Sequence, residues 1–183
     1  MTARSRLLAQ KNSIKVYLGE MKLSNSEETQ LIIEQAHKAA LEGIKTSLKE
    51  VEKQITQMIQ QDAAIEKNYE LLLSVPGIGH LTAVYIICCT NNFICKITGK
   101  QLASYAGVAR FGHTSSTSIK GRDKVHKMAN KDLKKLLHLG AISAITYYPE
   151  FRDYYDRKVK EGTHKQLVIN AVRSEIAIRA EGY

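Results

Sequence analysis

Between residues 71 and 83 the chain reads Leu-Leu-Leu-Ser-Val-Pro-Gly-Ile-Gly-His-Leu-Thr-Ala. This order predicts that an apolar helix ends, a Pro-Gly-x-Gly turn follows and a second apolar helix begins. Further helical patterns cover Leu133–Ile145, Pro149–Lys160 and Thr163–Arg179. No convincing alternation of apolar and polar residues, the pattern of a half-buried strand, occurs along the chain. The sequence therefore predicts an all-α fold.

The composition is that of a basic globular protein. Its 183 residues include 27 Lys and Arg against 18 Asp and Glu, a formal net charge of +9, which favours a polyanion or an anionic surface as partner. The longest apolar run, Ala83 to Cys89, is far shorter than the roughly 20 residues of a membrane-spanning helix. Three cysteines within eight residues predict no disulfide framework and fit a reducing cytoplasm. The basic N-terminus lacks the apolar core of a signal peptide.

The first 72 residues predict two helices. Residues 1–23 form a short basic helix, and a capping box of Ser24 and Glu27 predicts that the next helix starts near Ser26. Apolar residues then recur at three- and four-residue steps, which predicts a long coiled-coil helix over residues 24–72. This stripe either folds back on its own domain or pairs with a second copy as a dimerisation stalk. Residues 73–183 are expected to form a compact helical domain.

The glycine-containing turn has two interpretations. Glycine adopts positive φ and carries no side chain, so successive backbone N–H groups can point at a phosphate oxygen, helped by the following helix N-terminus. The order of helix, glycine-containing turn and helix resembles a helix–hairpin–helix element, a motif that binds the DNA backbone. The candidate contacts in the turn are Pro76, Gly77, Ile78 and Gly79. The alternative is a tight turn between two core helices.

A basic block with a run of hydroxyl residues follows the turn. Residues 96–135 contain ten Lys and Arg but only two Asp, and residues 114–118 read Thr-Ser-Ser-Thr-Ser. The run is either a solvated loop or the site of a nucleophile, since a serine that attacks a phosphodiester needs cationic donors nearby. The candidate DNA contacts in this block are Arg110, Lys120, Lys124, Lys127, Asn130 and Lys134.

Five motifs occur in an order that resembles one protein family. They are Val75-Pro-Gly-Ile-Gly with Thr82-Ala83, Leu102-Ala-Ser-Tyr-Ala-Gly-Val-Ala109, Thr114-Ser115-x-Thr-Ser118 with Gly121-Arg122, Lys127-x-Ala-Asn130 with Leu133-Lys134, and Tyr154-Tyr155 with Gly162 downstream. The set is similar to the C-terminal domain of transposases of the insertion-sequence "one-ten / one-sixteen" family, which includes site-specific DNA invertases.

The resemblance implies a serine nucleophile. Ser115 matches the family's serine, with Ser116 as its competitor, and Arg122 matches the motif that follows and is expected to assist catalysis. In that family a separate N-terminal RuvC-like nuclease domain binds divalent metal through four acidic residues, and some members use a structured guide RNA. The acidic residues of this chain lie mostly on helix faces, so no metal site and no cofactor are expected in it. Nothing precedes Met1, so we expect a truncated element, inactive alone, that needs a nuclease domain in trans.

Together these expectations describe a DNA-binding transposase domain of the bacterial cytoplasm. DNA is the expected partner, the resemblance adds a guide RNA, and the coiled coil adds a second copy of the chain as a homo-oligomer. Two other classes of protein remain open at this point. One is a non-enzymatic nucleic-acid-binding module, and the other is a coiled-coil interaction protein whose basic face serves solubility.

Overall fold

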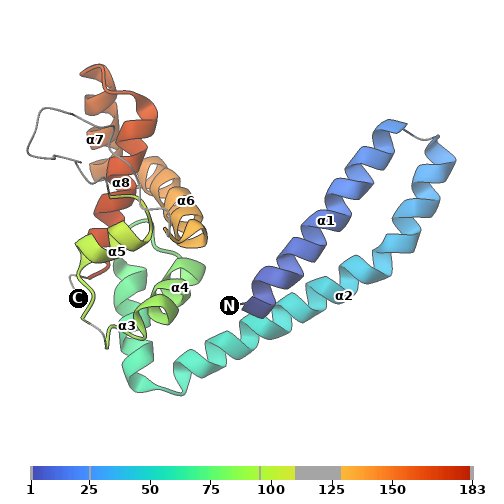
Figure 1. The fold of residues 1–183 in the computed structure, drawn as a ribbon, viewed down its shortest axis with the longest axis horizontal. Helices are drawn as coiled ribbons and strands as arrows, with labels where there is room; N and C mark the ends of the chain where they lie inside the picture. The colour runs from blue at the N-terminus through green and yellow to red at the C-terminus, as the bar shows by residue number, and fades with distance from the viewer. Residues whose placement is uncertain (1, 25, 95, 110–128, 182–183) are drawn as a thin grey trace, which may run out of the picture. The chain divides into compact units, whose positions relative to one another are not determined.

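The computed structural model describes residues 2–24, 26–94, 96–109 and 129–181. Over these ranges the chain forms eight α-helices and no strand, which confirms the predicted all-α class (Figure 1). It divides into two compact units, residues 1–62 and residues 63–183, each of which is described by itself. None of the helices in the described ranges is both long and apolar enough to cross a membrane.

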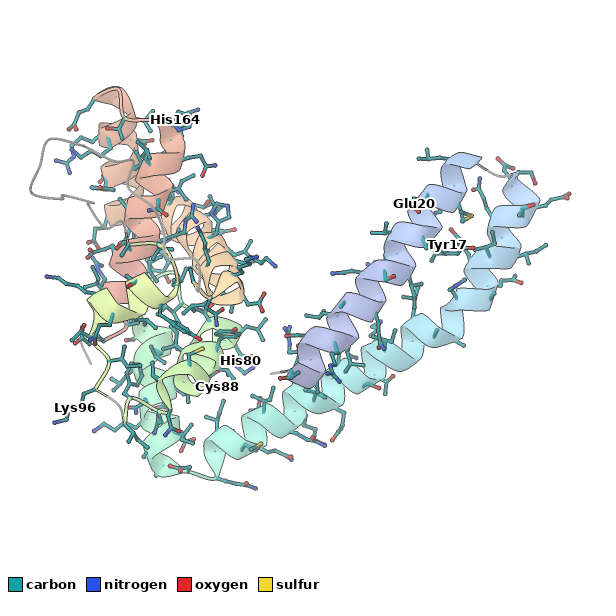
Figure 2. The ribbon with its side chains drawn as sticks, viewed as in Figure 1. Tyr17, Glu20, His80, Cys88, Lys96 and His164 are labelled. Carbon is teal, nitrogen blue, oxygen red and sulfur yellow. The ribbon has the colours of Figure 1, made fainter. Side chains whose placement is uncertain are left out.

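The first unit is an antiparallel pair of helices, α1 (Thr2–Ser24) and α2 (Glu27–Gln60), which lie side by side in Figure 1. An ion pair of 2.9 Å joins Arg4 Nε to Glu52 Oε1. At the other end of the pair, Lys22 Nζ lies 2.8 Å from Glu34 Oε1. Between them the ring of Tyr17, labelled in Figure 2, lies 5.4 Å from the ring of His37.

The buried seams of both helices follow the spacing of a coiled coil. Steps of three and four residues place a narrow apolar stripe along a helix, and two such stripes pack into each other. On α1 the series is Arg4, Leu7, Lys11, Ile14, Leu18 and Met21, all half-buried, with Leu8 half-buried beside it. On α2 the series is His37, Leu41, Ile44, Leu48, Val51 and Ile55. Residues of α1 in the same chain therefore cover the predicted stripe as far as residue 55. Pairing with a second copy remains a prediction.

The start of α2 confirms the expected helix start near Ser26, but the capping at that end and the position of the other end differ from the expectation. The N-cap is Ser26, whose side chain makes no capping hydrogen bond, so the predicted capping box of Ser24 and Glu27 is wrong. The physical reason is register, because Glu27 is the first helical residue and a capping box needs its acid two positions later. At the other end α2 stops at Gln60 and the next helix starts at Ala63, so the helix expected over residues 24–72 is interrupted. The break lies at Asp62, which is also where the apolar series lacks a member.

The second unit packs six helices around one core. They are α3 (Ala63–Ser74), α4 (His80–Thr90), α5 (Gly99–Tyr105), α6 (Lys131–Tyr147), α7 (Pro149–Lys160) and α8 (Lys165–Arg179). The last three match the predicted helices, whereas α5 was not predicted. The central pair is α6 and α8, with α4 and α7 packed on α6 and α5 packed on α8. Fully buried side chains of the core include Leu72, Ile86, Leu102, Leu133, Leu137, Val172 and Ile176.

A charged contact ties α7 to α8. The guanidinium of Arg179 donates to both carboxylate oxygens of Glu150, over 3.2 and 2.5 Å, and to Glu175 over 2.9 Å. These hydrogen bonds hold the pKa of Glu150 below the usual carboxyl value, with slight desolvation opposing them. Because the pKa of Glu150 is lower in the folded state than in the unfolded state, its contact with Arg179 stabilises the fold at pH values above the ordinary carboxyl pKa. This stabilisation is lost as the pH falls through the lowered value.

We expect Arg179→Gln to raise the pKa of Glu150 towards its ordinary value, because the charge-assisted hydrogen bonds disappear. An NMR titration of the Glu150 side-chain carboxyl carbon measures the change directly. Lys165→Gln, which removes one exposed positive charge from the start of α8, is the matched control and should leave that pKa in place. A pKa unchanged in Arg179→Gln would contradict the assignment.

Candidate functional site

The turn at residues 75–79 joins α3 to α4, as the sequence predicts. Gly77 has φ +88°, and the N–H of Ile78 donates to the carbonyl of Val75 over 3.0 Å. Gly79 is the N-cap of α4 in an extended conformation, with no side chain to cap the helix. The first N–H groups of a helix lack acceptors within it, so this end of α4 can donate to an anion. The helix–hairpin–helix assignment and the phosphate contact remain predictions.

The two glycines of the turn have different surroundings. A Cβ on Gly77 would lie 2.7 Å from Ile176 Cδ1 and 2.8 Å from the carbonyl oxygen of Gly140. A Cβ on Gly140 would overlap the carbonyl oxygen of Gly77. The turn and α6 therefore meet backbone to backbone at this pair. Gly79, by contrast, faces outward, because it is exposed and a Cβ added to it would have no atom within 4 Å.

A hollow of about 480 Å³ lies between this turn and α6. His80, at the start of α4 in Figure 2, is held there by a 2.6 Å hydrogen bond between its Nδ1 and the hydroxyl of Tyr69. Ser143 and Tyr148 also line the hollow. Among the described residues that line it there is no Lys or Arg. The described lining residues therefore bring no lysine or arginine charge to the hollow.

The basic block is only partly within the described residues. Lys134 lies half-buried on α6, six residues before Gly140, while Lys131 and Lys135 are exposed near the start of the same helix. The remaining candidates lie outside the described residues: Arg110, Ser115, Ser116, Lys120, Arg122, Lys124 and Lys127. Their predicted roles in catalysis and DNA binding stay predictions, as does that of Lys134.

The described chain on either side of residues 110–128 meets at the end of α5. On the leading side, the N–H of Val108 donates to the carbonyl of Ala103 over 2.9 Å, and Asn170 Nδ2 of α8 donates to the Val108 carbonyl over 2.8 Å. On the trailing side, the N–H of Asn130 donates to the carbonyl of Tyr105 over 2.8 Å. Val108 and Asn130, which lie on either side of the undescribed residues, are thus both hydrogen-bonded to residues of α5.

Asn130, a predicted DNA contact, makes several hydrogen bonds within the protein. Its Oδ1 accepts from the N–H groups of Asp132 and Leu133, over 3.1 and 2.9 Å, which makes it the N-cap of α6. The same oxygen accepts from the hydroxyl of Tyr85 over 3.1 Å, and Nδ2 donates to the hydroxyl of Tyr105 over 2.9 Å. Burial raises the pKa of Tyr85, while the hydrogen bond to Asn130 opposes that rise. These bonds give Asn130 a structural role that the motif alone did not indicate.

Metal ligands do not gather in this part of the protein. Over residues 2–24, 26–94, 96–109 and 129–181, no three His, Cys, Asp or Glu side chains lie close enough to hold a metal ion. Cys88 is exposed and Cys89 half-buried, with burial raising the pKa of the Cys89 thiol against a hydrogen bond with Tyr105.

Two features of this region had sequence signals that the family motifs do not reveal. Thr98 and Gln101 form the capping box of α5, with reciprocal hydrogen bonds of 3.3 and 2.8 Å, and their Thr-x-x-Gln spacing is a typical helix start signal. Asn130 stands three residues before Leu133, where the helical pattern begins, and asparagine is a favoured N-cap. The meeting of Gly77 with Gly140 had no local signal, because the two residues are 63 positions apart.

Comparison with known proteins identifies the domain that holds these features. Residues 69–156 match the sequence model described as "Transposase IS116/IS110/IS902 family". Residues 69–156 thus belong to the IS116/IS110/IS902 transposase family. The match begins within α3 and ends within α7, so it includes the glycine turn, residues 110–128 and Asn130. The family resemblance drawn from the ordered motifs is thereby confirmed.

Individual relatives agree with the family assignment. An insertion element IS110 protein of Streptomyces coelicolor is 34% identical over 109 residues, which are 59% of this chain and 27% of that protein. The pilin gene-inverting protein of Moraxella bovis is 30% identical over 134 residues, 72% of this chain and 42% of its own length. An insertion element IS900 protein of Mycobacterium paratuberculosis is 30% identical over 71% of this chain and 34% of its own length. The chain thus spans less than half the length of each of these three relatives.

Proposed function

We propose that this chain is the DNA-binding, serine-bearing part of a transposase that acts in DNA transposition or site-specific inversion. The observation that carries the proposal is the family match over residues 69–156, which spans the glycine turn and the serine-containing stretch together. The Moraxella relative is named as a gene-inverting protein, which supports recombination between DNA sites as the reaction class.

In the proposed reaction the Oγ of Ser115 attacks the phosphorus of a DNA phosphodiester. A bond forms between the serine oxygen and phosphorus, the bond from phosphorus to one deoxyribose oxygen breaks, and that oxygen leaves with a proton. The serine proton passes to a base, and Arg122 offsets the negative charge that gathers on the phosphorus oxygens. Ser116 is the alternative nucleophile. A nuclease domain with its own divalent metal would act from another polypeptide segment or chain.

DNA binding would combine backbone donors with cations. The exposed Gly79 end of α4 offers N–H groups to a phosphate, in keeping with the candidate role of residues 76–79. The lysines and arginines of residues 96–135 would supply the positive charge that such a contact needs, because the hollow at the turn contains none among its described lining residues. A guide RNA and a homo-oligomer formed through α1 and α2 are further partners in this proposal.

DNA affinity should fall steeply with salt, and the steepness should depend on the lysines of the serine stretch. Each phosphate that the protein neutralises contributes about −0.9 to the slope of log K against log salt on duplex DNA. The triple variant Lys120→Gln/Lys124→Gln/Lys127→Gln should therefore flatten the slope by about 0.9 for each phosphate that it no longer neutralises. Fluorescence anisotropy with a labelled duplex, repeated at several salt concentrations, gives the slope.

A matched variant separates this site from general charge. Lys45→Gln/Lys49→Gln/Lys53→Gln removes the same charge from three exposed positions on α2 and should leave the slope nearly unchanged. An equal flattening in both variants would show that only net charge matters. A wild-type slope near zero would favour a coiled-coil interaction protein instead. The same titration with a structured RNA in place of the duplex tests whether the chain also binds RNA.

A further inference from the structure

The first turn of α4 leaves polar groups without partners among the residues that the structure describes. The first hydrogen bond into the helix runs from the N–H of Ala83 to the carbonyl of Gly79 over 3.0 Å. Gly79 has no side chain to cap the N–H groups of residues 80–82, which therefore lack acceptors within the described ranges. The hydroxyl of Thr82 has no hydrogen bond in this part of the chain either, although Thr82 is only 5% exposed. Because buried hydroxyl groups nearly always have a hydrogen-bond partner, these unused donors indicate a ligand site.

The residues that carry these donors line the hollow between the turn and α6. His80, Leu81 and Thr82 are its lining residues from α4, and His80 lies at the start of that helix in Figure 2. α6 contributes Leu139, and Tyr148 follows directly after that helix. These two side chains are 67% and 43% exposed, so a ligand can reach them. The hollow is therefore lined both by residues with unused donors and by residues with exposed apolar or aromatic side chains.

One nucleotide of a DNA strand matches this combination. A helix N-terminus binds a phosphate through its N–H groups, and a neighbouring hydroxyl adds one more donor. Aromatic side chains stack on the bases of single strands whatever the base. At about 480 Å³ the hollow falls within the size range of pockets that hold small molecules, so it has room for one nucleotide. A base inside a duplex is paired and stacked, so only an unpaired base can enter such a pocket.

We infer that this hollow binds one unpaired nucleotide of a DNA strand, with its phosphate on the N–H groups of residues 80–82 and the Thr82 hydroxyl, and its base stacked on Tyr148. The inference rests on the proposed function, and it adds the form of the DNA to the phosphate contact proposed there. The net charge of +9 attracts any nucleic acid. A preference for an unpaired strand comes instead from stacking, since the described lining residues include no lysine or arginine.

The stacking contact is tested by Tyr148→Leu, which removes the aromatic ring. Its matched control is Tyr147→Leu, because the neighbouring Tyr147 is 75% exposed and is not among the described lining residues. Fluorescence anisotropy with the full chain and a short labelled oligothymidylate should give an affinity about fivefold or more lower in Tyr148→Leu, and a wild-type affinity in Tyr147→Leu. The affinity for a duplex of the same length should be unchanged in both variants.

The phosphate contact is tested by Thr82→Val, which keeps the size and branching of the side chain but removes the hydroxyl. Loss of a hydrogen bond to a charged phosphate should lower the single-strand affinity by about tenfold. Thr146→Val makes the same change at an exposed site on α6, outside the described lining of the hollow, and should leave that affinity in place.

Gly79→Asp tests the N–H groups with a variant that should keep its fold. The position is extended, with φ −99°, and an added Cβ would meet no atom within 4 Å. An aspartate at the N-cap accepts from the second or third helical N–H group and stabilises the helix end, so the melting temperature should rise. The same carboxylate occupies the phosphate site, so the single-strand affinity should fall about tenfold or more. Gly43→Asp adds an equal charge at an exposed site on α2 and should change that affinity by less than about twofold.

The outcomes separate the nucleotide site from the proposed function. Wild-type single-strand affinity in Tyr148→Leu, in Thr82→Val or in Gly79→Asp would overturn the site, and so would an equal loss of duplex affinity in Tyr148→Leu. A larger loss with an oligouridylate than with the oligothymidylate would overturn the assignment to DNA. Melting curves followed by circular dichroism identify any variant that has unfolded, and Gly79→Asp then decides.

The wild-type chain supplies the remaining comparison. A chain that binds a duplex but no single strand would overturn this inference alone. A chain that binds neither form of DNA would overturn the proposed function, and this inference with it.

Discussion

Gly140→Ala is expected to destabilise the second unit by about 3 kcal/mol, because the new methyl group has no space. The added carbon would overlap the carbonyl oxygen of Gly77, and this neighbour is backbone rather than a side chain that can turn away. α6 and the turn at residues 75–79 must then separate, which also loosens the packing of Leu137 and Ile176 around them. Hydrogen exchange at the amides of these two core residues measures the loss of stability within this unit alone.

Gly43→Ala is the matched control in the first unit. It makes the same chemical change in a helix interior, but Gly43 is exposed and no atom lies within 4 Å of the new methyl group. Alanine favours helix over glycine, so this variant should stabilise α2 by about 0.5–1 kcal/mol. Opposite signs for the two substitutions are therefore expected, and a neutral Gly140→Ala would show that α6 and the turn do not meet closely in solution.

Ser115→Ala is expected to abolish covalent linkage between the chain and DNA, because the alanine methyl group cannot bond to phosphorus. The chain would be mixed with the nuclease domain of a family member, divalent metal and a labelled duplex that carries an end of the insertion sequence. A covalent product survives denaturing detergent and migrates slowly on a gel. DNA affinity in the salt titration should stay within about twofold of wild type, since a neutral hydroxyl contributes little to phosphate binding.

Ser116→Ala separates the two candidate nucleophiles. After trypsin digestion both serines lie in one peptide, residues 111–120, so mass spectrometry can locate the attached nucleotide. Linkage that persists in Ser115→Ala but disappears in Ser116→Ala would move the nucleophile by one residue. Linkage that persists in both variants would contradict attack by either serine.

Much of the fold was predictable because its signals are local. Both ends of the helix from Pro149 to Lys160 were predicted. Proline favours the first turn of a helix, and Gly162, which has φ +87°, follows the last turn as a glycine that terminates a helix. The turn at residues 75–79 was predicted for the same reason, through its proline and two glycines. The family, too, was recognisable from the order of short motifs.

The candidate site was less predictable, because its contacts join distant residues. The motif around Asn130 predicts a DNA contact, yet the described hydrogen bonds of this residue reach Tyr85 and Tyr105, 45 and 25 positions away. The apolar stripe on α2 indicated a coiled coil but not its partner. That partner is α1 of the same chain. Its half-buried series includes the charged residues Arg4 and Lys11, so the sequence showed no apolar stripe on this helix.

By itself the sequence determined the helical class, the positions of most helix ends, the glycine turn and the transposase family, since each depends on residues within a few positions of one another. The tertiary structure decided which of the two turn glycines packs inward, what covers the stripe on α2, and which tyrosines Asn130 contacts. These features depend on which helix faces meet, and that choice follows from burying the whole apolar surface at once rather than from any local pattern.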